Sequence, residues 1–415
     1  MTKTDTTNPI VIVGGGLAGL ATALTLAKRG HGVTLLDQGG GEADRIRTTT
    51  LNPLAMQHLG ELGIIAWMEK QSRPLVPVTA ITVSDEKQYQ GRPNADDRLM
   101  GWDDDTPLAY VARNGDMVDA ALALARRNRL ITLQQGVAIS GFNPVDKDHG
   151  HAAACLTDTN GNRWPASLII ACDGGGSPLR EMAGIRTIER NPGQTAIVAD
   201  VQLERPHGQV AWQRFLKGGP VALMPLSDST MASLVWTLKD EDAKVLLDAD
   251  PASFGQSLTE IALAPFGMMV LASDRRGWSL RLRHAIRPYA QRLVLLGDAA
   301  HAIHPLAGQG FNLAVGDMIG LADALEWGDD HGCEPGDASV LARYARGRVT
   351  ETAAMTMATD GLNALFSFSP APLRSLAGAA MTILDQSPLK NIALNFANGT
   401  PVSYTHLRAH ETSNH

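Results

Sequence analysis

The chain has 415 residues, of which 44% are hydrophobic and 19% are charged, and its formal net charge is −7 at pH 7. This composition is typical of a globular protein with two or three structural units. The net negative charge and the lack of any Lys/Arg-dense run argue against a nucleic-acid partner. Cys155, Cys172 and Cys333 lie far apart without C-x-x-C spacing. We therefore expect no disulfide framework, no metal site and a reducing, cytoplasmic location.

The polar N-terminal decapeptide leads directly into an apolar strand and lacks the pattern of a signal peptide. No run of about 18 apolar residues occurs along the chain. Contact with the inner membrane, if the protein makes it, is therefore expected to be peripheral.

The first 37 residues contain the pattern of a βαβ unit. Ile10–Val13 is a short apolar run, Ala18–Lys28 has the period of a helix, and Val33–Leu36 is a second apolar run that ends on Asp37. Strand, tight turn, helix and strand within about 30 residues predict two parallel strands of one sheet.

The turn between the first strand and the helix reads G-x-G-x-x-G. The first glycine, Gly14, permits the tight turn, Gly16 lets the backbone approach a pyrophosphate, and Gly19 allows close packing of helix on sheet. The N–H groups at the helix start, around Leu17 and Ala18, would hold the anion. A dinucleotide site is predicted here, and a purely structural turn is the alternative.

Asp37 ends the second strand, where an acidic side chain binds the ribose hydroxyls of adenosine, and Gln38 follows it. The strand, the turn, the helix and this acid are thus in register for a dinucleotide. These residues alone do not choose between NAD and FAD.

The rest of the chain divides into an α/β part and a β-rich part. A helix is predicted over 116–128 and a buried strand over 167–171. The sequence pattern of 186–284 predicts a mostly antiparallel sheet with Gly, Pro and Asp turns. The buried-strand pattern returns at 292–297, and a helix is expected to start near 309–310. After residue 331 the chain is predicted to be helical, with a break at 369–372.

Three further motifs carry a family resemblance. Asp173–Arg180 reads D-G-x-x-S-x-x-R, Gly297–His301 reads G-D-A-A-H, and His304–Asn312 reads H-P-L-A-G-Q-G-F-N. In order and spacing, these motifs resemble those of the group A flavin monooxygenases with the para-hydroxybenzoate hydroxylase fold. Within that group the last stretch is most similar to the ubiquinone-biosynthesis hydroxylases of polyprenylated phenols. Arg47–Leu51 matches that family's R-x-x-A-L region, with Thr50 in place of the usual Ala.

The resemblance covers the chain to about residue 400 and implies an α/β fold. It implies an FAD-binding, Rossmann-like domain of the glutathione reductase type, an inserted, mostly antiparallel β substrate domain, and C-terminal helices. We expect the FAD-binding domain at 1–75, 105–185 and 285–330, the substrate domain at 76–104 and 186–284, and the helical segment at 331–400.

The same resemblance implies the residues that bind FAD. Asp298, after Gly297 at a strand end, would bind the ribityl hydroxyls, although capping of the next helix is an alternative. Backbone at Gly308 and Gly310 would approach the flat flavin ring, next to Phe311 and Asn312. Further expected contacts are Arg47 at the FAD phosphate or ribose, Arg113, and Asp173 near the entry of NAD(P)H.

His304, Pro305 and Gln309 are the candidate catalytic residues. Pro305 would stiffen the loop beside the flavin, and Gln309 would contact the flavin ring through its backbone or side chain. His304 would either transfer a proton or act as a hydrogen-bonded loop residue. His301 and His304 are not expected to bind a metal ion, because the sequence offers no further ligands at suitable spacing.

The implied activity is hydroxylation of a polyprenylated phenol, with FAD as cofactor, NAD(P)H as reductant and O2 as oxidant. Membrane or quinone-biosynthesis complex association would follow from such a substrate. The alternatives are a hydroxylase of a small soluble phenol and, in another class, a non-catalytic FAD-binding partner protein. A flavin-dependent halogenase is disfavoured, because the seven tryptophans include no W-x-W pair.

The segment 401–415 has no apolar period, and the family resemblance stops before it. Its stretch SYTHLRAHET resembles translated sequencing-adaptor DNA. We interpret the segment as a non-native or flexible tail and give it no functional role.

Overall fold

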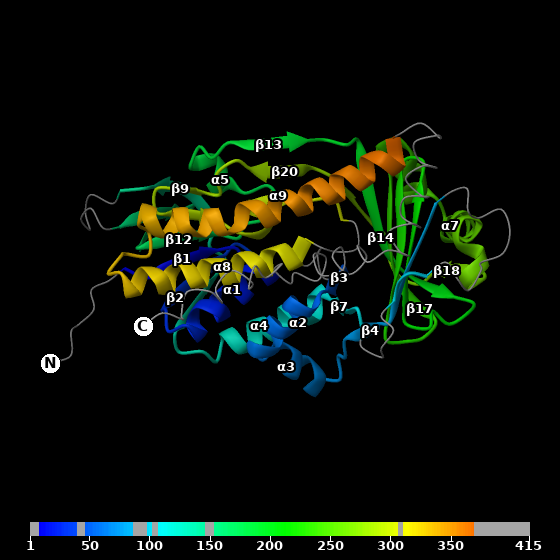
Figure 1. The fold of residues 1–415 in the computed structure, drawn as a ribbon, viewed down its shortest axis with the longest axis horizontal. Helices are drawn as coiled ribbons and strands as arrows, with labels where there is room; N and C mark the ends of the chain where they lie inside the picture. Colours follow the sequence, from blue (N-terminus) through cyan, green and yellow to red (C-terminus); the bar gives the residue numbers. More distant parts are fainter. Residues whose placement is uncertain are drawn as a thin grey trace, which may run out of the picture.

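The computed structural model describes residues 8–39, 46–85, 98–101, 107–145, 153–305 and 310–368. Two large sheets lie side by side along the molecule, with long helices next to them (Figure 1). The predicted α/β class is confirmed. The predicted segments 306–309 and 369–415, which include the expected break at 369–372 and the tail, lie outside the described residues.

The predicted βαβ unit forms the centre of the first sheet. Strand β1 (Ile10–Val13) leads through the glycine turn into α1 (Leu17–Lys28) and on to β2 (Val33–Asp37), which pairs with β1 in parallel. The sheet has six strands in the order β21-β22-β12-β1-β2-β8. The remaining strands are β8 (Ile131–Gln135), β12 (Leu168–Ala171), β21 (Tyr289–Ala290) and β22 (Leu293–Leu295).

Both faces of this sheet are covered, which explains its continuous apolar strands. Successive side chains point to opposite faces. Ile10 and Ile12 pack into the large core beneath α1, α4 (Asn114–Ala125) and α8 (Gly310–Asp330). Val11 and Val13 pack into a second core on the opposite face. That core is closed by α5 (Pro178–Met182) and a small sheet of β9 (Ile139–Asn143), β10 (Ala154–Asp158) and β11 (Arg163–Ala166).

The second large sheet has eight strands and is mostly antiparallel, as predicted for 186–284. Along it the strands run β18-β14-β17-β16-β15-β5-β6, and β19 also pairs with β14. Their bounds are β5 (Ala80–Asp85), β6 (Arg98–Gly101), β14 (Gln194–Leu203), β15 (Val210–Leu216), β16 (Gly219–Pro225), β17 (Met231–Lys239), β18 (Met269–Leu271) and β19 (Arg276–Ser279).

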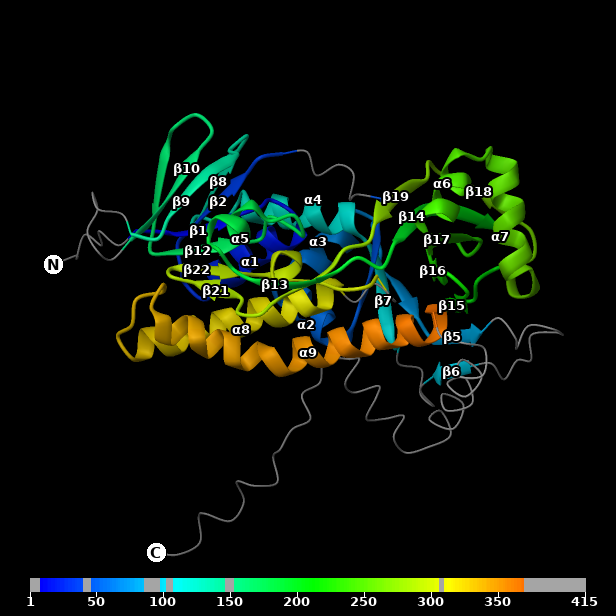
Figure 2. The ribbon, with the colours of Figure 1, turned by 90° about the horizontal axis from the view of Figure 1, so that it is seen from above.

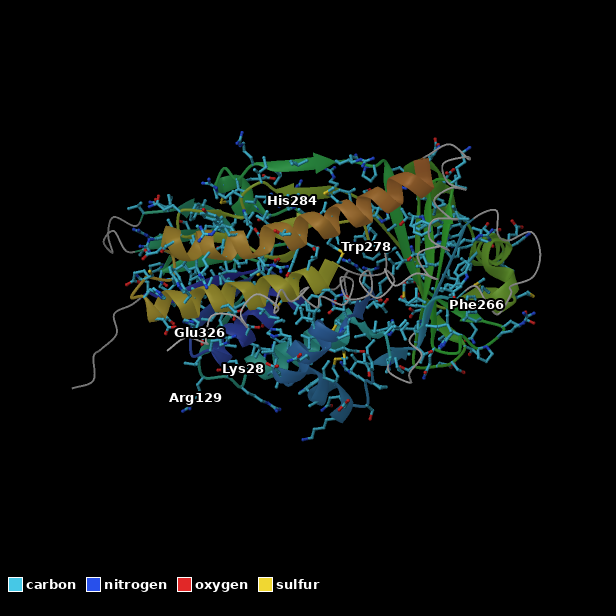
Figure 3. All side chains as sticks on the ribbon, viewed as in Figure 1. Lys28, Arg129, Phe266, Trp278, His284 and Glu326 are labelled. Carbon is cyan, nitrogen blue, oxygen red and sulfur yellow. The ribbon has the colours of Figure 1, made fainter. Side chains whose placement is uncertain are left out.

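Two helices cover the outer face of the second sheet, where only strands were expected. They are α6 (Asp240–Asp248) and α7 (Pro251–Phe266). Side chains from alternate positions of the strands, including Trp212 and Trp236, pack with Phe254 and Phe266 of α7 in one core. Figures 1 and 3 show α7 and the labelled Phe266 at the end of the molecule remote from β1. The other face of the sheet is turned toward the first sheet.

Smaller elements fill the space between the two sheets. One three-stranded sheet joins β3 (Thr48–Leu51), β7 (Ala109–Arg113) and β4 (Val76–Val78), and another joins β13 (Thr187–Arg190), β20 (Leu282–Ala285) and β23 (His301–Ala302). Helices α2 (Pro53–Glu61) and α3 (Ile64–Lys70) follow β3. The long helix α9 (Ala338–Phe368) packs along α8 and continues to β15 and β16, so it bridges both halves (Figure 2).

Side chains from β3 and β7 connect the first half to the inner face of the second sheet. Arg113 forms an ion pair with Asp200 of β14, with Nη2 and Oδ2 2.8 Å apart. The hydroxyl of Thr48 donates to Ser233 Oγ at 3.1 Å. The expected domain boundaries stay a prediction.

We expect the Arg113–Asp200 pair to contribute little to stability. The two side chains are 36% and 16% exposed, and ion pairs at such positions contribute about 1 kcal/mol or less. Asp200→Asn should therefore lower the free energy of unfolding by no more than about 1 kcal/mol in urea titrations. Asp274→Asn, at an exposed acid of the same half, is the matched control. A loss of several kcal/mol at Asp200 alone would identify the pair as a main link between the halves.

Candidate functional site: a dinucleotide cavity and the start of helix α8

The glycine turn after β1 opens onto a cavity of about 540 Å³. A Cβ on Gly14, whose φ is +112°, would collide with the carbonyl oxygen of Cys172 at the end of β12. A Cβ on Gly19 would collide with the carbonyl oxygen of Gly14. Backbone thus packs directly on backbone at both positions, and no other residue type fits the turn as built.

Gly16 differs from these two glycines, because a Cβ there would meet no protein atom within 4 Å. The space beside it belongs to the cavity, which Leu17 also lines. Gly16 caps α1 with extended backbone and no side-chain hydrogen bond, so the first N–H groups of the helix, at Leu17 and Ala18, face outward without helical partners. This arrangement fits a pyrophosphate at the positive end of the helix dipole.

Asp37 and Gln38 both line the cavity at the end of β2. The Asp37 carboxylate accepts a hydrogen bond from the Gly15 amide at 3.1 Å, so the turn holds this side chain at the rim. Apolar side chains close the same cavity: Leu35, Val118, Leu122, Leu133, Val137 and Ile139. Polar groups at one wall and apolar groups at another fit the ribose and the adenine ring of a dinucleotide.

Asp173 lines the same cavity, next to the glycine turn. One of its oxygens accepts from the Leu179 amide at 3.2 Å, whereas the other, Oδ1, is buried without a hydrogen-bond partner among the described residues. Burial raises the pKa of this carboxyl. An unsatisfied buried oxygen is costly unless a ligand satisfies it, so Asp173 fits a contact with a bound cofactor.

The second predicted motif lies directly beside the glycine turn. Gly297 and Asp298 form the short 3-10 helix η2 (Gly297–Ala299), and Gly297 has a φ of +60°. Gly297 lies close to Ala18 of α1 and Ala314 of α8. A Cβ added to Gly297 would lie 3.6 Å from the Ala18 Cβ and 3.4 Å from the Ala314 Cβ. Asp298 is exposed, and its Oδ1 lies 4.0 Å from the Cβ position of Gly310. The two nucleotide motifs and the start of α8 therefore meet at one place.

Two of the candidate catalytic residues, His304 and Pro305, precede α8 in the described part of the chain. His304 is fully buried, and neither ring nitrogen has a hydrogen-bond partner among the described residues. Burial lowers the pKa of His304 to about 4, so the imidazole is neutral at pH 7. Pro305 follows it and is half-buried, while Gly308 and Gln309 lie outside the described residues.

Three residues of the first turn of α8 were predicted to contact FAD. Gly310 starts the helix beside Asp298, and Phe311 packs against the large core. Asn312 is buried, and its side-chain amide donates to the Thr50 carbonyl at 2.9 Å while its oxygen accepts from the Asn52 amide at 3.3 Å. These bonds tie the start of α8 to β3.

Arg47 and Arg113 lie near the cavity but do not line it. The carbonyl oxygen of Arg47 accepts from the amide of Asn114, a cavity-lining residue, at 2.9 Å. Arg113 is engaged with Asp200, as described above. The FAD contacts expected of these arginines stay predictions.

Sequence reasoning missed a buried polar cluster behind η2. Asp317 of α8 accepts hydrogen bonds from the Gly297 amide, from His301 and from Arg348 of α9. A charged residue within the apolar pattern of α8 was the available signal, since buried charges require partners. Asn114, which lines the cavity and accepts a bond from Thr49 Oγ1 at 2.7 Å, was also missed.

Comparisons with known proteins agree with this geometry. Residues 7–358 match the family described as FAD binding domain. The chain therefore belongs to this family of FAD-binding proteins. Its class is that of the flavin-dependent aromatic monooxygenases, with FAD as cofactor.

The similar curated proteins match almost end to end. The human protein "Ubiquinone biosynthesis monooxygenase COQ6, mitochondrial" is 29% identical, over 95% of this chain and 93% of its own length. "Ubiquinone hydroxylase UbiL" of Rhodospirillum rubrum is 30% identical, over 95% of this chain and 90% of its own.

Solved structures share the fold at lower identity. The p-nitrophenol 4-monooxygenase PnpA of Pseudomonas putida has a TM-score of 0.73 at 19% identity, over 95% of this chain and 98% of its own. HpxO of Klebsiella pneumoniae, solved with FAD and uric acid, has a TM-score of 0.70 at 16% identity, over 95% and 96%.

The contrast between Gly16 and Gly19 gives a test of the pyrophosphate position. Gly16→Ala adds a methyl group into open space, so the apoprotein should keep its stability while FAD binds at least about tenfold more weakly, or about 1.4 kcal/mol. Gly19→Ala should lower the stability of the apoprotein by about 1–3 kcal/mol, because the methyl group overpacks the turn. Thermal unfolding and FAD titration measure the two effects. Unchanged FAD affinity in Gly16→Ala would place the pyrophosphate elsewhere.

Asp298→Ala tests the ribityl contact. Loss of hydrogen bonds to a charged group should weaken FAD by about 1.5–3 kcal/mol, or roughly ten- to a hundredfold. Because Asp298 is exposed, the apoprotein should unfold at the same temperature as the wild type. An unchanged dissociation constant would restrict Asp298 to a role in the turn.

Proposed function

We propose that the protein hydroxylates the aromatic ring of a polyprenylated phenol in ubiquinone biosynthesis, using FAD, NAD(P)H and O2. The observation that carries this proposal is the end-to-end similarity to proteins named as ubiquinone-biosynthesis hydroxylases. Of the stretch His304–Asn312, the described residues His304 and Pro305 precede α8, and Gly310–Asn312 form its first turn beside the second nucleotide motif.

When bound and reduced by NAD(P)H, FAD supplies the chemistry that activates O2 and transfers one oxygen atom to the ring. The chain's own residues bind and orient the partners. The turn at Gly16 would hold the pyrophosphate, Asp37 the adenosine ribose, and Asp298 the ribityl chain. The first N–H groups of α8, from Gly310 onward, would stabilise negative charge on the reduced ring.

We place the phenol between the loop before α8 and the inner face of the eight-stranded sheet. Thr50 of β3 supports this placement, because its carbonyl accepts from Asn312 and its hydroxyl lies 3.7 Å from the Met224 sulfur on β16. Ala222 and Met224 belong to a small apolar core on this inner face. An apolar wall next to the ring would exclude water from the reaction.

His304 is the candidate for contact with the phenol hydroxyl. Its two buried nitrogens, which have no partner among the residues that the structure describes, could accept one hydrogen bond and donate another as a neutral imidazole. The pKa of about 4 makes it a weak base. We therefore propose that His304 orients the hydroxyl by hydrogen bonding, with Pro305 and Gln309 as its expected companions in the loop.

A substrate with a polyprenyl tail would reach the protein from a membrane or from a carrier. No helix in the described part of the chain is long and apolar enough to cross a bilayer. Peripheral contact with the inner membrane, or association with other quinone-biosynthesis proteins, therefore belongs to the proposal. Cytoplasmic location belongs to it as well.

The test compares one phenol with and without a two-unit prenyl chain. Each buried CH2 group contributes about 0.8 kcal/mol, so the prenylated phenol should give a far higher kcat/KM for product formation coupled to NAD(P)H consumption. Equal efficiency on the two would favour a soluble-phenol hydroxylase. If neither phenol stimulated NAD(P)H oxidation by the FAD-loaded protein, the non-catalytic alternative would gain support.

A further inference from the structure

A cluster of charged side chains is buried behind the Gly297–Asp298 turn. Asp317 is 1% exposed, and its Oδ2 accepts from the Gly297 amide at 3.1 Å and lies 2.6 Å from His301 Nε2. Its Oδ1 accepts from Arg348 Nε at 2.9 Å. Both carboxylate oxygens are thus used, and one of them is bonded to the residue that precedes Asp298.

The fold makes room for this cluster. Arg348 comes from α9 and crosses two turns of α8, where a Cβ on Gly316 would collide with its guanidinium and a Cβ on Gly320 would lie 3.0 Å from its Cδ. Arg348 also donates to the Leu313 carbonyl at 3.2 Å and to Glu351. The glycines of α8 therefore let a buried arginine reach the first turns of the helix that begins beside Asp298.

The charges of the cluster depend on one another. Burial is the largest single effect on His301 and opposes its charged form, but the attraction and hydrogen bond of Asp317, together with the attraction of Asp298, outweigh it and raise the pKa of the imidazole. His301 and Arg348 likewise keep the pKa of Asp317 low despite its burial. With His301 protonated, two cations surround one carboxylate, and the three side chains carry a net positive charge next to the expected ribityl chain and phosphates.

We propose that Asp317 is a positioning residue for FAD. Together with His301 and Arg348 it fixes the Gly297 amide, and thereby Asp298 and the start of α8, and it keeps a positive charge beneath the cofactor. The inference rests on the proposed placement of FAD at Asp298 and does not depend on the identity of the phenol.

The groups that face His301 come from four elements. They are Asp317 from α8, Arg348 and Tyr344 from α9, Asp298 from η2 and His284 from β20, whose backbone pairs with His301. All of these residues except Asp298 line a cavity of about 20 Å³. This cavity is large enough for one water molecule, which needs roughly 10–15 Å³. Within the described part of the chain, the buried Nδ1 atoms of His301 and His284 have no hydrogen-bond partner. His284, labelled in Figure 3, lines this cavity together with residues of α9.

His301 is distinguished by the direction of its pKa shift. Burial lowers the pKa of His284, His304 and His58, so these imidazoles lose their protons below the ordinary histidine range. His301 keeps its proton to higher pH. The positive charge is therefore present at low pH and is lost as the pH rises through the raised pKa, so FAD should bind more weakly above it.

The experiment measures the FAD dissociation constant of the full chain between about pH 6 and 9, with no phenol present, in the wild type, His301→Gln and Asp317→Asn. The wild type should lose about tenfold in affinity across the raised pKa of His301, the equivalent of one pKa unit of linkage. His301→Gln keeps a neutral polar side chain, so it should bind FAD at all pH values as the wild type does at high pH. Asp317→Asn should bind FAD more weakly and lose the step, because His301 then titrates below its ordinary pKa.

Tyr344→Phe is the matched control. Its hydroxyl donates to the Leu295 carbonyl at 3.2 Å in the same core, outside the ionic cluster, and the variant should keep the pH step of the wild type. Melting curves of the apoproteins show which variants fold, and His301→Gln carries the test if Asp317→Asn does not. The proposal would be overturned if His301→Gln bound FAD with the same affinity and the same pH dependence as the wild type. A wild-type affinity that does not change with pH would overturn it as well.

Discussion

Backbone in contact with backbone at the end of β1 is the constraint on which the nucleotide site depends. The Gly14 carbonyl lies where a Cβ of Gly19 would be, and the Cys172 carbonyl lies where a Cβ of Gly14 would be. These contacts bring the start of α1 to the ends of β1 and β12, so that the unpaired N–H groups of the helix open onto the cavity. The position of Asp37 follows from the same turn, because its carboxylate binds the Gly15 amide.

The second half of the molecule is joined to this site through the short strand β3 and the long helix α9. β3 is only four residues long, yet Thr50 contacts both Asn312 at the start of α8 and Met224 on the inner face of the eight-stranded sheet. α9 packs on α8 and reaches β15 and β16 as well. A movement of the eight-stranded sheet would therefore shift α8 through two separate connections, one through β3 and one through α9.

Local sequence patterns predicted the parts of the structure that local physics determines. The strand Ile10–Val13, the helix that follows and the strand ending on Asp37 were predicted because a doubly covered parallel sheet requires continuous apolar runs. The motif residues Gly14, Gly16 and Asp37 were predicted from spacing and Asp173 from the family resemblance, and the structure places all four around one cavity.

Interactions between residues distant in sequence could not be predicted from such local patterns. The partner of Arg113 is 87 residues away, and Asn312 binds residues of β3 and its C-terminal neighbour some 260 residues earlier. The bonds from Asp317 to His301 and Arg348 depend on the packing of α8 against α9. Helices α6 and α7 were missed because they fall within 186–284, which was predicted as a mostly antiparallel sheet, whereas the outer face of that sheet requires an apolar cover.

The cysteine behind the glycine turn has a chemical consequence. Cys172 is buried, lies against Gly14 and Gly19, and borders the cavity. Burial raises the pKa of its thiol far above the ordinary value, and the thiolate is the form that peroxides and alkylating reagents attack. A flavoprotein that activates O2 produces peroxide whenever oxygen transfer fails. The residue on which its nucleotide turn packs thus carries a thiol that is inert to that by-product for as long as the turn stays closed.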